Sequence, residues 1–475
     1  MKKIFTLIFL FAVLVPSARA QYPSQNITML DMWDSIQIPA EGFYNIRYNG
    51  IWGWKNNNDG KEYAIIGSSE GTHFVEVTNP SNIKQRDFVA GRRNQCIWRE
   101  YKTYQNYCYM VSDDGSPNSM QIIDMQYLPD SVHVVYDNNN MIERSHTLFI
   151  DGNKLYLGIP KGAAVGGSSE LAVFSLANPQ LPSFLHKIES DGISGLDNSH
   201  DMFVRNDTVY ASMSYTGLFM FKYNTNNTFS LLASLTSYPN QGYNHSSALT
   251  QNGNILIFCD EVPTNLPIKA LDVSNFSNLN IVSQFKSTVS TIATPHNPFI
   301  RANDNTRLIQ AYYQDGVQIF DISNPANVVR TGFFDTNPTD CPSCPNPSYS
   351  GCWGVYVDLP SGIILASDMQ NGLFVLDAGN ALTSKEEESK FLSSVSVYPN
   401  PSNGNFNLAL KMKVSDEVTI EVRDVAGRLI LTEKQKIAAG LNTLNIGSST
   451  IDAGIYMIRI SGSDFTHSEQ LIRTN

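Results

Sequence analysis

The sequence predicts an all-β protein, a seven-bladed β-propeller followed by a small C-terminal β-sandwich. Three observations predict it. A strand-rich unit recurs seven times between residues 26 and 378, and an unpaired strand at its N-terminal end is left over to complete the last unit. The tail, residues 395–475, alternates apolar and polar residues in short runs separated by turn signals. Repeats of about 40 to 50 residues with three or four strands each are typical of propeller blades.

The first 20 residues have the pattern of a signal peptide. Lys2 and Lys3 precede an apolar run from Ile4 to Val15, and small residues lead up to Gln21. This run is short for a membrane span, so we expect cleavage after Ala20. No later stretch offers about 20 apolar residues, so no transmembrane segment is predicted in the mature chain.

The mature chain is acidic. The 475 residues carry a net charge of −11, and removal of Lys2, Lys3 and Arg19 with the signal peptide brings it near −14. This charge argues against nucleic acid as a partner. It would attract cations, although it is also a common means of staying soluble.

The predicted propeller covers residues 21–384. Its repeat is clearest in residues 295–327, which read HNPFI, LIQAYYQDG and VQIFDISNP. The last unit ends at residues 372–377 without a fourth strand, whereas residues 27–36 form a strand with no unit of its own. Pairing these two would close the ring and remove an exposed sheet edge. The units are 45 to 57 residues apart and open near Trp52, Trp98, His146, His200, His245, His296 and Trp353.

A charged stretch at residues 385–394 is predicted to be a linker to the C-terminal domain. Within that domain, residues 397–406 read VYPNPSNGNF, residues 422–430 read VRDVAGRLI and residues 453–460 read AGIYMIRI. Together these motifs closely resemble the type A sorting domain of the type IX secretion system of Bacteroidetes. The resemblance implies that residues 395–475 are recognised by the outer-membrane translocon. It also implies that the protein is released outside the cell or attached to its surface through a lipopolysaccharide.

The repeats resemble those of LVIVD-repeat propellers, which include secreted proteins described as choice-of-anchor B. The resemblance rests on VEVTNPSN at residues 75–82, IFDISNPAN at 319–327 and LFVLDAGN at 373–380. It rests also on the strand openings SHTLFI, SHDMFV and PHNPFI. The family implies an architecture and no particular activity.

Four of the eight histidines open the first strand of consecutive units, and in a propeller these strands line the central channel. The turns between the second and third strands carry acids, so a ring of imidazoles and carboxylates is predicted at one mouth of the channel. Trp52, Trp98 and Trp353 would complete this ring. The candidate metal ligands are His146, His200, His245, His296, Glu261 and Asp368, and Asp113 and Asp315 join the tryptophans as candidates for a ligand-binding rim.

Two interpretations of this ring remain open. Imidazoles and carboxylates suit a divalent metal ion such as zinc, manganese or iron, and they also suit acid–base catalysis; the sequence assigns no cofactor beyond this candidate ion. Alternatively, each histidine donates a hydrogen bond to the next blade and recurs simply because the blades recur. The blade spacing argues against all four histidines binding one ion.

Six cysteines remain after export, so disulfides are plausible in an oxidising compartment, although their pairing cannot be assigned. The disulfide candidates are Cys96, Cys108, Cys341, Cys344 and Cys352, and Cys259 is expected to be a buried free thiol.

The sequence favours a secreted or surface-attached recognition module whose propeller binds a glycan, a peptide or a surface protein. The alternative is a metal-dependent hydrolase or lyase at the channel mouth, for which His200, His245, His296 and Glu261 are the expected residues. A stoichiometric metal ion would distinguish the second function from the first.

Overall fold

The structure is a computed structural model that describes residues 22–115, 118–193, 195–290, 292–302, 304–338, 350–383, 392–403, 405–424, 428–446, 451–463 and 466–474. The predicted signal peptide and most of the predicted linker lie outside these residues. The chain forms two compact units, residues 1–384 and 385–475, and each is described by itself. Among the described residues, no helix is long and apolar enough to cross a membrane.

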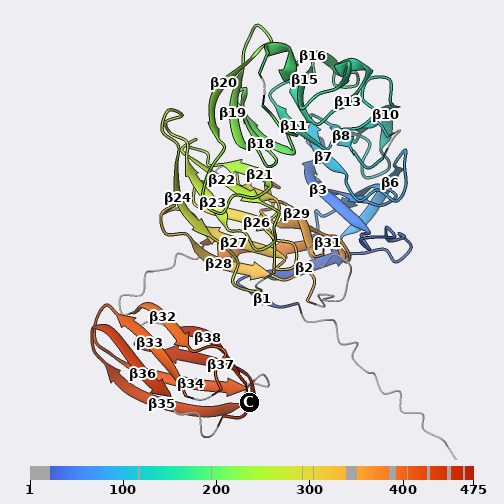
Figure 1. The fold of residues 1–475 in the computed structure, drawn as a ribbon. Helices are drawn as coiled ribbons and strands as arrows, with labels where there is room; N and C mark the ends of the chain where they lie inside the picture. Colours follow the sequence, from blue (N-terminus) through green and yellow to red (C-terminus); the bar gives the residue numbers. More distant parts are fainter. Residues whose placement is uncertain are drawn as a thin grey trace, which may run out of the picture. The chain divides into compact units, whose positions relative to one another are not determined.

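The first unit is all-β and propeller-like: antiparallel sheets of at least four strands surround a common centre (Figure 1). The first sheet contains β3 (Tyr48–Lys55), β4 (Glu62–Ser68), β5 (Gly71–Glu76) and β6 (Lys84–Ala90), and the second contains β7 (Glu100–Tyr104), β8 (Tyr107–Val111), β9 (Met120–Asp124) and β10 (His133–Asn138). The third contains β11 (Thr147–Asp151), β12 (Lys154–Gly158), β15 (Leu171–Ser175) and β16 (Ser183–Lys187). The fourth contains β17 (Asp201–Arg205), β18 (Thr208–Met213), β19 (Gly217–Tyr223) and β20 (Phe229–Leu235).

Three further sheets follow in the same unit. The fifth sheet contains β21 (Asn244–Leu249), β22 (Ile255–Asp260), β23 (Ile268–Asp272) and β24 (Asn280–Phe285). The sixth contains β25 (Pro298–Ile300), β26 (Arg307–Ala311), β27 (Val317–Asp321) and β28 (Val329–Phe334), and the seventh contains β29 (Cys352–Tyr356), β30 (Ile364–Asp368) and β31 (Gly372–Asp377). The third sheet carries an insertion with β13 (Lys161–Gly162), η1 (Ala163–Val165) and β14 (Gly167–Ser168), and is followed by η2 (Ile188–Asp191). A short helix, α1 (Gly379–Thr383), ends the described part of the unit.

The N-terminal segment joins two of these sheets. Strand β2 (Thr28–Trp33) pairs antiparallel with β31, and β1 (Ser24–Gln25) pairs with β28 of the neighbouring sheet. The approach to β31 is close: a Cβ atom on Gly372, whose φ is +89°, would lie 2.4 Å from the carbonyl oxygen of Trp33. A glycine is therefore required where β2 meets β31.

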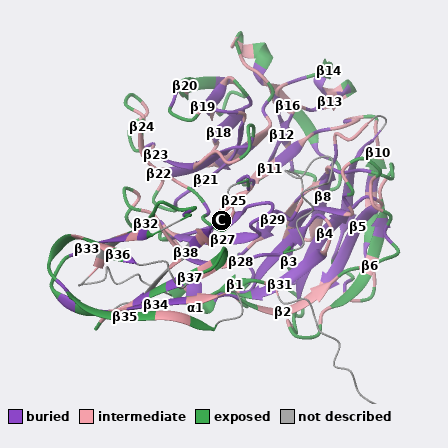
Figure 2. Cartoon of the chain, turned by 60° about the horizontal axis from the view of Figure 1, so that its bottom comes forward, coloured by how far each residue is buried: buried purple, intermediate pink, exposed green. Residues whose placement is uncertain are grey.

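The first strands of consecutive sheets contact one another, from β3 through β7, β11, β17, β21 and β25 to β29, and β29 contacts β3. Burial differs between the inner and the outermost strands of the sheets. All residues of β4, β9 and β22 but one are buried, whereas most of β6 and β20 is exposed at the outer edge (Figure 2). The outermost strand of a sheet has no neighbour on one side, so its side chains alternate between the core and water.

Local sequence explains the hairpins within the sheets. Asn206 and Asp207 form the two-residue turn between β17 and β18, with φ of 51° and 58°. Two positive φ angles give the type I′ turn, whose twist matches that of paired strands, and Asn and Asp tolerate this conformation best among non-glycine residues.

The second unit has two antiparallel sheets. One contains β32 (Leu392–Tyr398), β33 (Phe406–Met412) and β36 (Gly440–Ile446); the other contains β35 (Leu429–Ile437), β34 (Asp416–Asp424), β37 (Gly454–Ser461) and β38 (Thr466–Arg473). Both sheets contribute to one apolar core, with Leu408 and Leu410 from the first and Val418, Ile420 and Ile458 from the second. The alternation read from the sequence places these side chains on one face of each strand.

Candidate functional site

A cavity of about 400 Å³ lies where the first strands of the first unit converge. All four candidate histidines line it, as do Glu261 and all three candidate tryptophans. Its wall also includes apolar side chains, among them Phe149, Phe203 and Phe299. A concave site of this size with apolar walls and a few convergent polar groups is typical of small-ligand binding.

Four imidazoles and two indoles form a ring at this cavity, which we call the histidine–tryptophan ring. It runs in the order His146, His200, His245, His296, Trp353, Trp98, and successive ring centroids are 4.2, 4.3, 4.3, 4.5 and 5.0 Å apart, with 6.5 Å between Trp98 and His146. Six of the seven first strands therefore contribute one aromatic ring each.

The strand register shows that Asn49, rather than Trp52, takes the corresponding place in the first sheet. Tyr48, Asn244 and Cys352 each pair with the last residue of the neighbouring strand, and Asn49, His245 and Trp353 follow them. Trp52 lies further along β3, where the Lys102 ammonium is 4.1 Å from its ring centroid. Sequence spacing alone could not detect this offset of three residues, because the equivalence is defined by the pairing with the neighbouring strand.

Hydrogen bonds connect the ring from sheet to sheet. His200 Nδ1 donates to the carbonyl of His245 at 3.3 Å, and His296 Nδ1 donates to the carbonyl of Trp353. A carbonyl only accepts, so Nδ1 carries the proton in both residues and Nε2 keeps its lone pair. The structural interpretation of the histidines expects bonds of this kind, because in it each histidine donates a hydrogen bond to the next blade. They also orient Nε2 as a ligand atom.

The four histidines differ in their electrostatics. Burial lowers the pKa of His200 and His245 well below the usual range, with neighbouring imidazoles adding to the effect, and it lowers the pKa of His296 to about 3. Burial acts the same way on His146, but the Asp113 carboxylate 2.8 Å from its Nδ1 outweighs it and raises the His146 pKa. Three of the ring imidazoles are therefore neutral at pH 7, and the fourth is paired with an acid.

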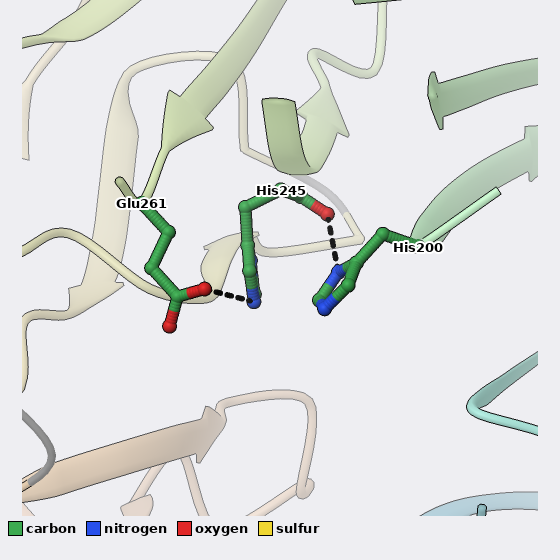
Figure 3. Close-up of side chains that lie close together, drawn as sticks. All are labelled: His200, His245 and Glu261. Carbon is green, nitrogen blue, oxygen red and sulfur yellow. Dashed lines mark hydrogen bonds and ion pairs between the residues drawn. The ribbon is translucent and has the colours of Figure 1, made fainter. Parts of the chain in front are cut away.

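His200, His245 and Glu261 form a cluster with the composition of a metal site (Figure 3). One ligand atom from each lies within 4.8 Å of the other two, and His245 Nε2 is 3.9 Å from a Glu261 carboxylate oxygen, Oε2. The other oxygen, Oε1, accepts a hydrogen bond of 2.8 Å from the Tyr313 hydroxyl. Burial raises the pKa of Glu261 to about 7, although the bond from Tyr313 lowers it.

The turn that carries Glu261 is fixed by its neighbour Asp260. The Asp260 carboxylate is fully buried and accepts hydrogen bonds from Tyr238, Asn244 and Lys269. Because Lys269 is buried as completely, the two charges compensate each other within the sheet. Glu261 thus projects from a rigid position at the end of β22.

Other predicted acids lie elsewhere. Asp368 does not line the cavity; it accepts bonds from the Thr336 hydroxyl and from the backbone of the β30–β31 turn, and burial raises its pKa to about 7. Asp315 accepts a bond from the backbone of Ser290 and does not line the cavity either. Asp113 reaches the cavity only through His146. Acids at equivalent turns therefore have different partners.

Three half-buried charged residues of the cavity, Glu100, Lys102 and Asp201, were not predicted. Burial raises the pKa of Glu100 and Asp201 and lowers that of Lys102. The Glu100 carboxylate accepts a bond from the Trp353 indole, and Asp201 accepts one from Thr147. The available signal was their position at even spacing after Trp98, for Glu100 and Lys102, and next to His200, for Asp201, in the first strands of two sheets.

Cys96, Cys108, Cys259 and Cys352 are buried free thiols. Cys259 is therefore as expected, whereas the structure forms no disulfide with the candidates Cys96, Cys108 and Cys352. Cys108 lies in β8 among the side chains of a buried core cluster. Cys341 and Cys344 lie outside the described residues.

Comparison with known proteins identifies the second unit. Residues 396–474 match the family of secretion system C-terminal sorting domains. This sorting domain indicates export by the type IX secretion system to the cell surface or the extracellular space, and with it an interaction with the secretion machinery. No curated protein matches the chain.

Solved structures similar to the chain share 10% sequence identity with it. They include a protein from Bacteroides uniformis described as a candidate 6-phosphogluconolactonase (TM-score 0.48; 84% of this chain and 98% of that chain covered), the β-propeller domain of Cps50 (Swd1) from Myceliophteria thermophila (0.49; 74% and 98%) and the WD40 β-propeller domain of Doa1 (0.48; 74% and 96%).

Proposed function

We propose that this protein is a secreted or cell-surface-attached binding module, in which a seven-bladed β-propeller captures the terminal unit of a glycan in its central cavity. Seven sheets with contacting first strands, and the pairing of β2 with β31, support the seven blades. The shared core of the two C-terminal sheets supports a β-sandwich. The repeat motifs support membership of the LVIVD-repeat group, and the export signal supports a leading signal peptide at residues 1–20.

The proposal rests on the residues that line the cavity. Aromatic side chains of Trp98 and Trp353 line the cavity together with the half-buried carboxylates of Glu100 and Asp201 and the ammonium of Lys102. Sugar rings present an apolar face that stacks on indoles and hydroxyl groups that bond to carboxylates and amines. Because buried charges are costly unless they find partners, a ligand with several hydroxyl groups fits this set well.

The test compares binding of the full chain and of two variants to a glycan array. Ser247 lines the cavity, and Ser247→Trp would fill it with an indole; Ser230→Trp on the exposed strand β20 is the matched control. We expect binding by the wild type and by Ser230→Trp, and a loss of at least tenfold in Ser247→Trp. Thermal unfolding of each variant shows whether it is folded.

Two results would contradict this function. Equal glycan binding by Ser247→Trp would place the ligand outside the cavity. Binding to a peptide array and to no glycan would replace the glycan with a peptide as the ligand class.

A metal-dependent hydrolase or lyase is the second candidate function, and one observation favours it: the cluster of two neutral imidazoles and a carboxylate at the cavity. This function requires turnover as well as a bound ion. If the protein releases a product from a glycan that it binds on the array, and a chelator abolishes this release, the enzyme function is supported over simple binding.

A further inference from the structure

We propose that His200, His245 and Glu261 bind one divalent ion of the zinc class at the wall of the central cavity, and that this ion contacts the captured ligand. The inference rests on the proposed ligand site, because the same cavity serves both. Two imidazoles and one carboxylate are the ligand set of many catalytic and ligand-binding zinc sites, and they suit cobalt, manganese and ferrous ions as well.

The distances are close to those of an occupied site. With metal–ligand bonds of about 2.1 Å, tetrahedral ligand atoms lie about 3.4 Å apart. His245 Nε2 and Glu261 Oε2 are 3.9 Å apart, and all three ligand atoms lie within 4.8 Å of one another. Small side-chain rotations are therefore enough to close the three residues around an ion, and the strands that hold them need not move.

Outer contacts already orient two of the three ligands. The carbonyl of His245 accepts the hydrogen bond from His200 Nδ1, which leaves the Nε2 lone pair for the ion (Figure 3). The Tyr313 hydroxyl donates to Glu261 Oε1, which leaves Oε2 beside His245. Tyr313 has φ of 36°, a conformation that costs a non-glycine residue energy. Hydrogen bonds of this kind to a backbone carbonyl and to the second carboxylate oxygen are the usual outer shell of a metal site.

The charge balance of the cluster favours a cation. Among the described residues, the Glu261 carboxylate has no ion pair with a lysine or an arginine, and the imidazole of His245 lies 3.9 Å from its Oε2. A buried carboxylate needs a compensating positive charge or a proton. A divalent ion supplies this charge. Three protein ligands also leave at least one coordination position, which a ligand in the cavity can occupy.

The test uses the full chain, produced without a histidine tag, stripped with a chelator and titrated with Co²⁺. Bound Co²⁺ has visible absorption bands whose intensity reports its coordination number, so it separates a built site from loose surface binding. We expect about one Co²⁺ per chain in the wild type, displaced by Zn²⁺. We expect Co²⁺ affinity to fall at least tenfold in His200→Asn and in Glu261→Gln.

His133→Asn is the matched control, since it removes an exposed histidine from the outer strand β10. Glu261→Gln keeps an acceptor for the Tyr313 hydroxyl and nearly the same volume, so it tests ligation with little effect on the fold. Absence of absorption bands in the wild type would overturn the metal site. Equal loss in His133→Asn and His200→Asn would do so too, because it would show surface binding.

The two proposals fail separately. If the wild type shows no Co²⁺ spectrum and still binds glycan after chelation, the proposed metal site is wrong and the proposed glycan-binding function stands. If the wild type binds one Co²⁺ and no glycan, the proposed metal site stands and the proposed glycan-binding function is wrong.

Discussion

At the scale of single residues, position in the repeat does not determine chemistry. His146 and His200 occupy equivalent places and their rings lie 4.2 Å apart, yet the pKa of the first is raised and that of the second is lowered. The difference is Asp113, which meets His146 and has no equivalent beside His200. A repeat places side chains, whereas their neighbours from other strands decide their protonation.

The buried carboxyl of Asp368 should make stability depend on pH. Its folded pKa is about 7, above the unfolded value of 3.8, so the native state keeps a proton that the unfolded state has lost between these pH values. The free energy of unfolding of the wild type should therefore fall, relative to Asp368→Asn, by on the order of 3 kcal/mol as pH rises from 4 to 7. Urea unfolding at several pH values measures this difference.

The exposed residue Asp130 supplies the control for this measurement, because Asp130→Asn should leave the wild-type pH profile unchanged. Parallel profiles for the wild type and Asp368→Asn would show that Asp368 is ionised in the native state at pH 5, contrary to our expectation. The Thr336 hydroxyl can donate to either side chain or accept from the amide, so the substitution preserves the local bonding.

At the scale of elements, the N-terminal segment is the most consequential. Ile27 is buried in a core cluster with Ile309 and Phe374, which belong to two different sheets. Tyr22 packs on Phe334 and Phe374, with ring centroids 5.6 and 5.2 Å apart. The segment therefore couples the start of the unit to its last two sheets through apolar contacts as well as through strand pairing.

Ile27→Ala and Ile36→Ala test this coupling within one segment. Ile27 is 4% exposed and Ile36 is 90% exposed. The first substitution should lower the free energy of unfolding by about 2 to 4 kcal/mol, since it removes buried methyl groups and leaves a cavity. The second should change it by less than about 0.5 kcal/mol. Equal effects in chemical denaturation would mean that the segment does not pack as described.

Strands and turns were the elements that the sequence predicted best, because alternation and turn residues are local signals. The all-β character is confirmed by the structure, and the sorting tail by its family match. The insertion of β13, η1 and β14 and the pairing of β1 with β28 were missed. Strands β13 and β14 are a two-residue pairing within one loop, and β1 pairs with a strand from the far end of the unit; neither is long enough to leave a periodic trace in the sequence.

At the scale of the whole molecule, the two compact units separate the propeller-like part of the chain, with its cavity, from the export domain. Deletion of residues 392–475 should leave the thermal unfolding of the first unit unchanged, since the second unit has its own core. The same deletion should abolish release or surface display in a bacterium with a type IX secretion system. Cell fractionation with immunoblotting measures this, and undiminished display of the truncated chain would contradict the role of the tail.

The candidate site was predictable in part. The repeat placed four histidines and Glu261 at one channel, and the cavity contains them all. Trp52 lies three residues beyond the position equivalent to the ring residues, and Asp315 and Asp368 are held by hydrogen bonds away from the cavity; strand pairing and hydrogen-bond partners of this kind are not visible in the repeat. The charges of Glu100, Lys102 and Asp201 resemble ordinary strand polarity in sequence, since burial is invisible there.

The sequence by itself determined the all-β class, the acidic balance, the export tail and the residue types that face the channel, because periodicity, turns and motifs are properties of neighbouring residues. Only the tertiary structure decided that Glu261 meets His245 and that Tyr313 holds it. It also decided which histidine pairs with an acid. These outcomes depend on residues 16 to 52 positions apart meeting in a buried space, and both the distances and the loss of water exist only once the chain has folded.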